Sequence, residues 1–128
     1  MNNIAKKVLI IEDSRFVREA LRQTLAQQGY EVITAADGEE GWKSASSAKP
    51  DIIVMDWLVP GVSGAALMQK FQDDIRTCTI PVFVISARSK ESEMDTASAS
   101  KISGFIQKDS VVLARLVQTL NQLTAQPN

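Results

Sequence analysis

Short apolar runs alternate with longer amphipathic segments along this chain. Unbroken runs occur at Val8–Ile11, Ile52–Met55 and Pro81–Ile85, and Phe105 with Ile106 makes a shorter one. Runs of this length that are bounded by turn residues are typical of strands buried on both faces of a parallel sheet. Glu31–Ala35 contains three β-branched residues and is the fifth predicted strand.

Helical spacing of apolar residues follows each predicted strand. Between Ser14 and Gln28 these residues recur every three or four positions, with Ser14 as an N-cap and Gly29 as a stop signal. The same reasoning predicts helices over residues 39–48, 63–72, 90–101 and 110–123. The segment 39–48 is the least favoured of these, because Gly41 in its interior costs about 1 kcal/mol relative to alanine.

Strands that alternate with helices predict an α/β fold with a parallel sheet and right-handed crossovers. A chain of 128 residues is long enough for one domain, and we expect a single domain over 1–128 with its core at about 7–123. The helix over 63–72 is expected to bury Ala66, Leu67 and Phe71 against the sheet.

Composition and charge narrow the function classes. The chain has 14 basic and 15 acidic residues, and its net charge of −1 disfavours binding to nucleic acid through bulk charge. It has one cysteine, Cys78, which is typical of a reducing compartment, and no apolar run approaches the ~20 residues of a membrane span. We therefore expect a cytoplasmic protein that binds neither membrane nor nucleic acid directly. The absence of histidine excludes a Ser-His-Asp triad, a histidine metal ligand and a histidine phosphocarrier within this chain.

Chemically active side chains follow four of the predicted strands. Glu12 and Asp13 follow the first run, Asp56 follows the run at 52–55, Ser86 follows the run at 81–85, and Lys108 comes just after the last strand. The carboxyl ends of parallel strands lie along one edge of a sheet, where open α/β folds bind their ligands. Each residue alone also fits a helix cap or a solvated loop charge, but together they predict a shared site.

Three carboxylates brought together repel one another and need a cation. Oxygen ligands without histidine or cysteine favour Mg²⁺, and the charges of three acids, Mg²⁺ and Lys108 nearly cancel. Such a site suits a phosphoryl group, and a carboxylate can be the nucleophile that forms an aspartyl phosphate. Glu12 and Asp13 are adjacent and best placed to hold the metal, so Asp56 is the candidate phosphoacceptor.

Several further residues complete a recognisable set of motifs. The set consists of Glu12, Asp13, Asp56, Pro60, Gly64, Ser86, Ala87, Phe105 and Lys108. It resembles the receiver domains of two-component response regulators, and the chain length and the Asp56–Trp57 pair resemble the stand-alone chemotaxis-like type. The resemblance implies a flavodoxin-like (βα)5 doubly wound sandwich, whose five-stranded parallel sheet has the order 2-1-3-4-5.

The resemblance also implies a role for each site residue. Asp56 would accept a phosphoryl group from a phosphohistidine on a sensor histidine kinase or a histidine phosphotransfer protein. Asp13, Asp56 and the backbone carbonyl of Leu58 would ligate Mg²⁺, with Glu12 acting through water. Lys108 would pair with Asp56 and then with the phosphate.

The response to phosphorylation is implied in the same way. Ser86 would donate a hydrogen bond to the phosphate, Phe105 would change its rotamer as Ser86 moves, and Ala87 would leave room for the phosphate to enter. The surface formed by the last two predicted helices and the strand between them would then change and control a protein target or an output domain. Such a chain is a signalling switch rather than an enzyme, and dimerisation on phosphorylation would be compatible with it.

Two positions depart from the family pattern. Asp109 stands where the family usually has proline after the lysine, and Lys101 stands where it often has glycine. A receiver-like interaction module that takes no phosphate therefore stays open as an alternative. A haloacid-dehalogenase-like phosphatase would need a second aspartate at the position of Leu58, and a flavodoxin-like FMN binder would need a phosphate loop where Glu12 and Asp13 stand. The chain fits both a complete regulator and a fragment of a longer protein.

Overall fold

The computed structural model describes residues 6–87, 100–109 and 112–124, and strands alternate with helices through these parts of the chain. The helix predicted over 90–101 lies almost entirely outside the described residues, as does Ser110 at the start of the last predicted helix. The elements are β1 (Lys7–Ile11), α1 (Arg15–Gln27), β2 (Glu31–Ala35), α2 (Gly38–Ala48), β3 (Ile52–Asp56), α3 (Gly64–Asp73), β4 (Val82–Ser86), β5 (Gly104–Gln107) and α6 (Val112–Thr124).

The strands form one parallel sheet in the order β2-β1-β3-β4-β5. This confirms the predicted α/β class and the flavodoxin-like strand order. The chain moves from β1 outward to β2 and then returns to the other side of β1, so the strand order reverses between β1 and β3. Ligands bind outside the carboxyl ends of the strands at such a reversal.

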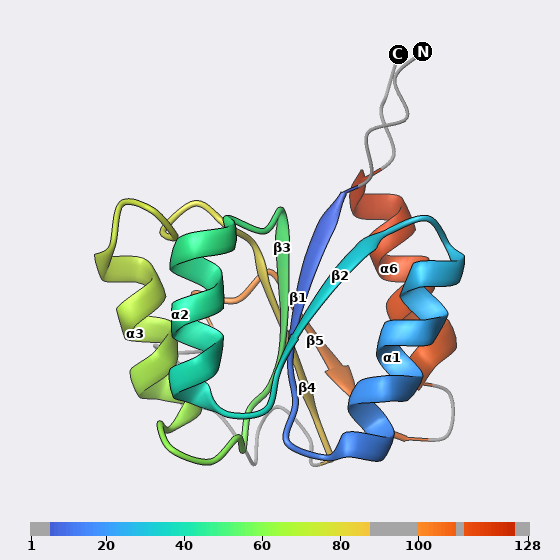
Figure 1. The fold of residues 1–128 in the computed structure, drawn as a ribbon, viewed down its shortest axis with the longest axis horizontal. Coiled ribbons are helices and arrows are strands. Elements are labelled where there is room, and N and C mark those ends of the chain that lie inside the picture. The colour runs from blue at the N-terminus through green and yellow to red at the C-terminus, as the bar shows by residue number, and fades with distance from the viewer. Residues whose placement is uncertain (1–5, 88–99, 110–111, 125–128) are drawn as a thin grey trace.

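Helices cover both faces of the sheet, with α2 and α3 on one face and α1 and α6 on the other (Figure 1). Successive residues of β1 alternate between two cores. Leu9 and Ile11 pack on the side of α2 and α3, whereas Val8 and Ile10 pack on the side of α1 and α6. All four side chains are fully buried, which explains why this strand is apolar without a polar alternation.

The boundaries of α1 follow its sequence signals. The Ser14 hydroxyl accepts a hydrogen bond from the Val17 N–H at 3.3 Å, and Gly29 beyond the helix end has a φ of 97°. Leu21 and Leu25 form the buried stripe that the spacing predicts. Within the described residues, the structure contains no helix long and apolar enough to cross a membrane.

Helix α2 forms despite the glycine in its interior. The Asp37 carboxylate caps the helix by accepting from the Glu40 N–H at 2.8 Å. A Cβ atom on Gly41 would lie 2.6 Å from Cδ1 of Ile11 in β1. The residue that weakens this helix locally therefore allows it to lie close against the sheet.

Helix α3 begins as predicted but buries a slightly different face. Ser63 caps it by accepting from the Ala66 N–H at 3.1 Å. Leu67 and Phe71 are buried, but Ala66 is exposed and Met68 is buried instead. The prediction for Ala66 was wrong because the buried stripe is turned toward the side on which Met68 lies.

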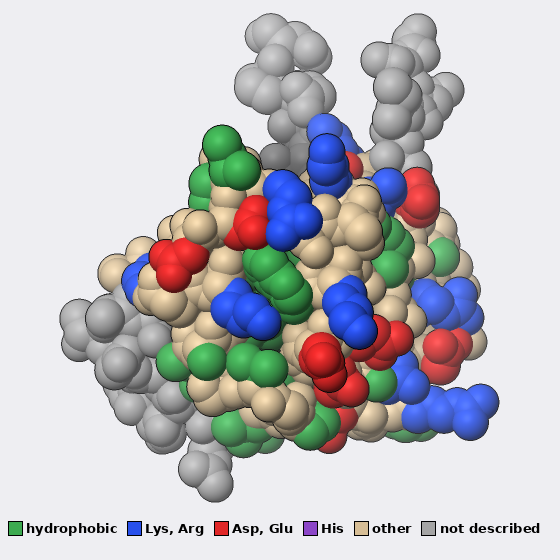
Figure 2. Space-filling model, turned by 60° about the vertical axis from the view of Figure 1, so that its left-hand side comes forward, with side chains coloured by type: hydrophobic (Ala, Val, Ile, Leu, Met, Phe, Trp, Pro, Cys, Tyr) green, Lys and Arg blue, Asp and Glu red, His purple; other side chains and the backbone are tan. Residues whose placement is uncertain are grey.

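The outer face of α2 and α3 carries charged side chains of both signs around apolar surface (Figure 2). Trp42 of α2 contacts Phe71 of α3 with 5.9 Å between ring centroids. The cationic groups of Lys70 and Arg76 lie 5.2 and 5.8 Å from the centroid of the Trp42 ring. Contacts of this kind contribute about 0.5–1 kcal/mol each at exposed sites, so Lys70 helps to hold α3 against α2, and Arg76 holds the segment that follows α3.

Candidate functional site

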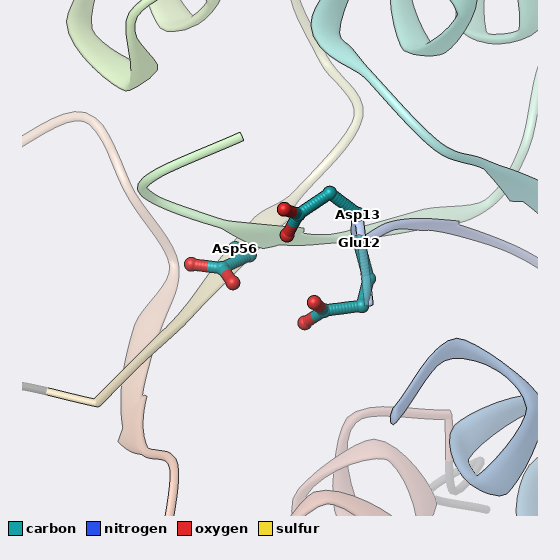
Figure 3. A group of neighbouring side chains, drawn as sticks. All are labelled: Glu12, Asp13 and Asp56. Carbon is teal, nitrogen blue, oxygen red and sulfur yellow. The ribbon is translucent and has the colours of Figure 1, made fainter. Parts of the chain in front are cut away.

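The acidic residues converge at the carboxyl edge of the sheet. Glu12 and Asp13 follow β1, and Asp56 is the last residue of β3. Their carboxylates point into one space (Figure 3), and one oxygen of each lies within 4.8 Å of the other two. Glu12 is fully buried, Asp56 is 7% exposed and Asp13 is exposed. The site therefore joins two buried carboxylates to one that faces solvent.

Hydrogen bonds from the two residues that follow Asp56 fix its position. The Trp57 N–H donates to the Ile85 carbonyl of β4 at 3.1 Å, so the sheet ladder continues one residue beyond β3. The chain then turns, and the Leu58 N–H donates to Asp56 Oδ1 at 3.1 Å. One carboxylate oxygen of Asp56 is thus held by the turn that follows it.

Lys108 reaches the acidic cluster from the end of β5. Its Nζ lies 2.8 Å from Asp56 Oδ2 and 2.8 Å from Glu12 Oε1. The contact with Asp56 is a hydrogen bond as well as an ion pair, whereas the contact with Glu12 Oε1 lacks the angles of a hydrogen bond. The Lys108 N–H also donates to the Ser86 carbonyl at 2.6 Å, which ties the lysine to β4. The structure thus brings Lys108 to Asp56, as the resemblance implies, and adds Glu12 as a second partner.

The electrostatics of the cluster favour an added positive charge. Burial raises the pKa of the Glu12 carboxyl above its ordinary value of 4.5, and the nearby Asp56 adds to this rise. Lys108 and the Ser14 N–H, which donates to Glu12 Oε2 at 2.9 Å, oppose the rise without reversing it. Burial alone would lower the pKa of the Lys108 amine, but its contacts with Asp56 and Glu12 raise that pKa above 10.5. Lysine alone therefore neutralises the acids incompletely.

The other predicted site residues lie on or just after β3, β4 and β5. Ser86 is the last residue of β4 and is fully buried, while Ala87 beside it is exposed. Phe105 lies on β5, which pairs with β4, and packs against the core on the side of α2 and α3. Leu58 is 58% exposed. Apart from Phe105, which lies within β5, the residues that the sequence assigns to one site are thus found at adjoining strand ends.

Gly64 closes the turn that follows Asp56. A Cβ atom on Gly64 would lie 2.5 Å from ring atoms of Trp57 and 2.7 Å from its carbonyl oxygen. Helix α3 begins at this glycine, so its first turn packs directly on the residue after Asp56. The close approach is the physical reason for a glycine at this position of the motif.

Arg18 contacts the backbone of the acidic pair, although no sequence motif points to it. Its Nη1 donates to the backbone carbonyls of Glu12 at 3.0 Å and Asp13 at 3.3 Å. In the sequence, Arg18 is one of several polar residues on an amphipathic helix. The available signal is its position, because it lies about one turn into the helix that starts beside the acidic pair.

The two residues that depart from the family pattern have partners on other elements. The Asp109 carboxylate lies 3.1 Å from Nη1 of Arg115 on α6. The Lys101 amine donates to the side chain of Gln69 on α3 at 2.8 Å. The negative charge of Asp109 is thus partly offset by Arg115, and it faces α6.

The donor set fits Mg²⁺. Its protein ligands would be oxygens, which hard cations prefer, and octahedral Mg²⁺ holds adjacent oxygens about 3 Å apart. The three carboxylate oxygens lie within 4.8 Å of one another, so small side-chain movements would bring them to that spacing. Three carboxylates and one ammonium leave a formal charge of −2, which one divalent cation neutralises.

Comparisons with known proteins agree with the site. The chain matches the family model described as the response regulator receiver domain over residues 8–121. It is 32% identical over 104 residues to the chemotaxis protein CheY1 of Helicobacter pylori, covering 80% of this chain and 84% of that protein. It is 33% identical over 101 residues to the transcriptional regulatory protein AfsQ1 of Streptomyces coelicolor, covering 79% of this chain and 44% of that protein. The chain spans less than half the length of the transcriptional regulators that it matches.

The solved structures agree with the sequence comparisons. The chemotaxis response regulator CheY4 of Vibrio cholerae superposes on this chain with a TM-score of 0.84 and 27% identity, covering 94% of this chain and 99% of that one. The fold, the motif residues and the relatives therefore all point to the family that the sequence motifs resemble.

Proposed function

Since this chain belongs to the response regulator receiver domain family, we propose that it is a phosphorylation-dependent switch of a two-component phosphorelay. Members of this family are signalling switches rather than enzymes in the usual sense. Asp56 is the proposed phosphoacceptor. The proposed phosphodonor is a phosphohistidine on a sensor histidine kinase or on a histidine phosphotransfer protein, which suits a chain without histidine.

The contact of Lys108 with two carboxylates from different strands carries the proposal. A lysine that served only as a solvated loop charge would not lie 2.8 Å from both Asp56 and Glu12. The ammonium lies next to the carboxylate that would carry the phosphoryl group. Preorganised positive charge at this point stabilises the charge that develops on the phosphoryl oxygens during transfer.

The transfer itself needs few groups. An oxygen of Asp56 forms a bond to phosphorus as the P–N bond of the phosphohistidine breaks, and the leaving imidazole takes up a proton. Lys108 exchanges its hydrogen bond to Asp56 for one to a phosphoryl oxygen. Ser86 donates a second hydrogen bond to the phosphate, and the small exposed Ala87 leaves the approach open.

We propose that Asp13, Asp56 and the backbone carbonyl of Leu58 hold Mg²⁺, with Glu12 acting through a water molecule. When bound there, Mg²⁺ supplies positive charge that neutralises the carboxylates and the incoming phosphate. The spacing of the carboxylate oxygens supports a cation shared by the three acids.

Phosphorylation adds about −1.5 to −2 charge and three acceptor oxygens. Ser86 moves toward the phosphate, and Phe105 changes its rotamer in the space that Ser86 leaves. The surface that includes β5 and α6 then changes its preferred state and controls a protein target or an output domain. Dimerisation on phosphorylation is compatible with this proposal.

The relatives support both kinds of output, which are a separate protein target and an output domain on the same chain. One is named as a chemotaxis protein of similar length, and another as a transcriptional regulator of more than twice the matched length. We propose that this chain acts in the cytoplasm through protein contacts, without binding nucleic acid or membrane itself.

Acetyl phosphate tests the proposed chemistry without a kinase. We expect intact-mass spectrometry to find one added phosphoryl group that requires both Mg²⁺ and Asp56, so that Asp56→Asn gives none. Asp73→Asn is the control, since Asp73 is an exposed aspartate at the end of α3. A folded, Mg²⁺-binding protein that gains no phosphoryl group and also fails to bind beryllium fluoride, which excludes rapid hydrolysis as the reason, would instead be a receiver-like interaction module.

A further inference from the structure

We propose that Arg18 is a positioning residue, which holds the turn that carries Glu12 and Asp13 in the conformation that binds a divalent cation. The inference deepens the proposed function and rests on it, because it assumes that the acidic cluster binds Mg²⁺. It concerns a residue of α1 that has no assigned part in the chemistry.

The hydrogen bonds of Arg18 lead directly to the acidic turn. One nitrogen, Nη1, donates to the carbonyl of Glu12 at 3.0 Å and to the carbonyl of Asp13 at 3.3 Å. The Arg18 N–H donates to the Ser14 carbonyl at 2.8 Å, which anchors the residue in the first turns of α1. Among the described residues, no carboxylate lies within ion-pair distance of the Arg18 guanidinium. Its charge-assisted bonds go to the backbone of the turn.

Glu12 and Asp13 depend on this turn to different degrees. Glu12 is fully buried, and its side chain also contacts Lys108 and the Ser14 N–H. Asp13 is exposed, and no hydrogen bond to its carboxylate comes from the rest of the described chain. The direction of the Asp13 carboxylate therefore follows from its backbone, and Arg18 is the side chain that donates to the Asp13 carbonyl.

Positioning and charge predict opposite effects on metal affinity. If Arg18 acted only through its charge, removing it would strengthen Mg²⁺ binding, because a cation near a cation site is repulsive. If Arg18 positions the turn, removing it weakens Mg²⁺ binding, because the ligands must be ordered when the metal binds. Groups that orient metal ligands typically affect affinity by about tenfold or more. The sign of the change therefore distinguishes the two roles.

Arg18→Met in the full chain tests the inference by calorimetric titration with Mg²⁺ alone. We expect the dissociation constant to rise about tenfold. Arg18→Lys keeps the charge and one donor group but loses the guanidinium fork, so we expect about half of that loss on a logarithmic scale. Arg22→Met is the matched control, since Arg22 lies one turn further along α1 and pairs with Glu19 at 2.8 Å. It should leave the dissociation constant unchanged within about twofold, which is the scale of a screened surface charge.

A measurement on the metal-free protein supports the test. Hydrogen exchange at the amides of Asp13 and Ser14 should be faster in Arg18→Met than in wild type and unchanged in Arg22→Met, because Arg18 donates to the carbonyls of this turn and Arg22 pairs with Glu19 instead. Unchanged or stronger Mg²⁺ binding by folded Arg18→Met would overturn the inference and leave the proposed function standing. Failure of the wild-type protein to bind Mg²⁺ would overturn both, so the two failures are distinct.

Discussion

Lys108 and Asp56 are 52 residues apart in the sequence, and their side chains form a hydrogen bond of 2.8 Å at the carboxyl edge of the sheet. Lys108 lies at the same distance from Glu12. The two carboxylates, which follow different strands, thus share the Lys108 ammonium. The stability of the metal-free protein therefore depends on this lysine.

Replacing Lys108 by methionine should lower the free energy of unfolding of the metal-free protein by about 2 kcal/mol. The cost is smaller than the typical 3–5 kcal/mol for breaking a fully buried pair, because the Lys108 side chain is 20% exposed and Glu12 can take up a proton. Urea unfolding in the presence of a chelator measures the change, and Lys43→Met is the surface control, since Lys43 is an exposed residue of α2. A stability equal to that of wild type would show that the lysine does not neutralise the acids.

Glu12→Gln should stabilise the metal-free protein at neutral pH. Burial holds the folded-state pKa of Glu12 above 4.5, the value in the unfolded chain. At a pH between these two pKa values, the folded protein retains a proton on Glu12 that the unfolded chain has lost. Wild-type stability therefore falls as the pH rises above 4.5 through the folded-state pKa, and the variant lacks this fall. The glutamine oxygen can still accept from Ser14. Urea unfolding across this pH range should give free energies of unfolding for wild type and variant that converge at low pH. A stability that falls more steeply with pH in the variant than in wild type would contradict the prediction.

Gly64→Ala should destabilise the protein by about 1–3 kcal/mol, although alanine favours a helix. The added methyl group would meet the Trp57 ring at 2.5 Å and the Trp57 carbonyl at 2.7 Å, so the chain that follows Asp56 has to move. The reverse change at the exposed neighbour, Ala65→Gly, measures the propensity term of about 1 kcal/mol alone. Gly64→Ala should lower the unfolding temperature and weaken Mg²⁺ binding. A stabilised Gly64→Ala variant with normal Mg²⁺ affinity would refute the prediction.

Asp109→Asn should change little, although this residue replaces the usual proline. The pair with Arg115 is exposed on both sides, at 38% and 51%, and such pairs contribute between 0 and about 1 kcal/mol. Because the carboxylate faces α6, its loss should change Mg²⁺ affinity by less than about twofold, whereas Asp13→Asn should weaken binding about tenfold or more. The same titration compares the two variants. Equal losses would mean that Asp109 contributes its charge to the metal site.

Most of the fold and the site could be predicted because the relevant signals are local. Buried parallel strands are continuous apolar runs, and the groups after them converge for topological reasons, so Glu12, Asp13, Asp56 and Lys108 could be collected without coordinates. The N-cap of α1 at Ser14 also depends on residues close in sequence.

The features that could not be predicted depend on contacts between distant elements. From the sequence alone, Gly41 only weakens the predicted helix. Its benefit, which is the close approach to Ile11 of β1, depends on a residue far away in the sequence. Ala66 was expected to be buried because apolar spacing gives the period of a helix but not its rotation against the sheet. Arg18 has no sequence signal that separates it from other polar residues of α1, since its partners are backbone carbonyls.

The most direct test of the central proposal is to identify the residue that carries the phosphoryl group. After reaction with acetyl phosphate and Mg²⁺, borohydride reduces an aspartyl phosphate to homoserine with loss of phosphate, and peptide mass spectrometry locates the change. We predict homoserine at position 56, in wild type and in Asp73→Asn, and nowhere in Asp56→Asn. Homoserine at position 13 or 51, with Asp56 unmodified, would contradict the assignment of the phosphoacceptor.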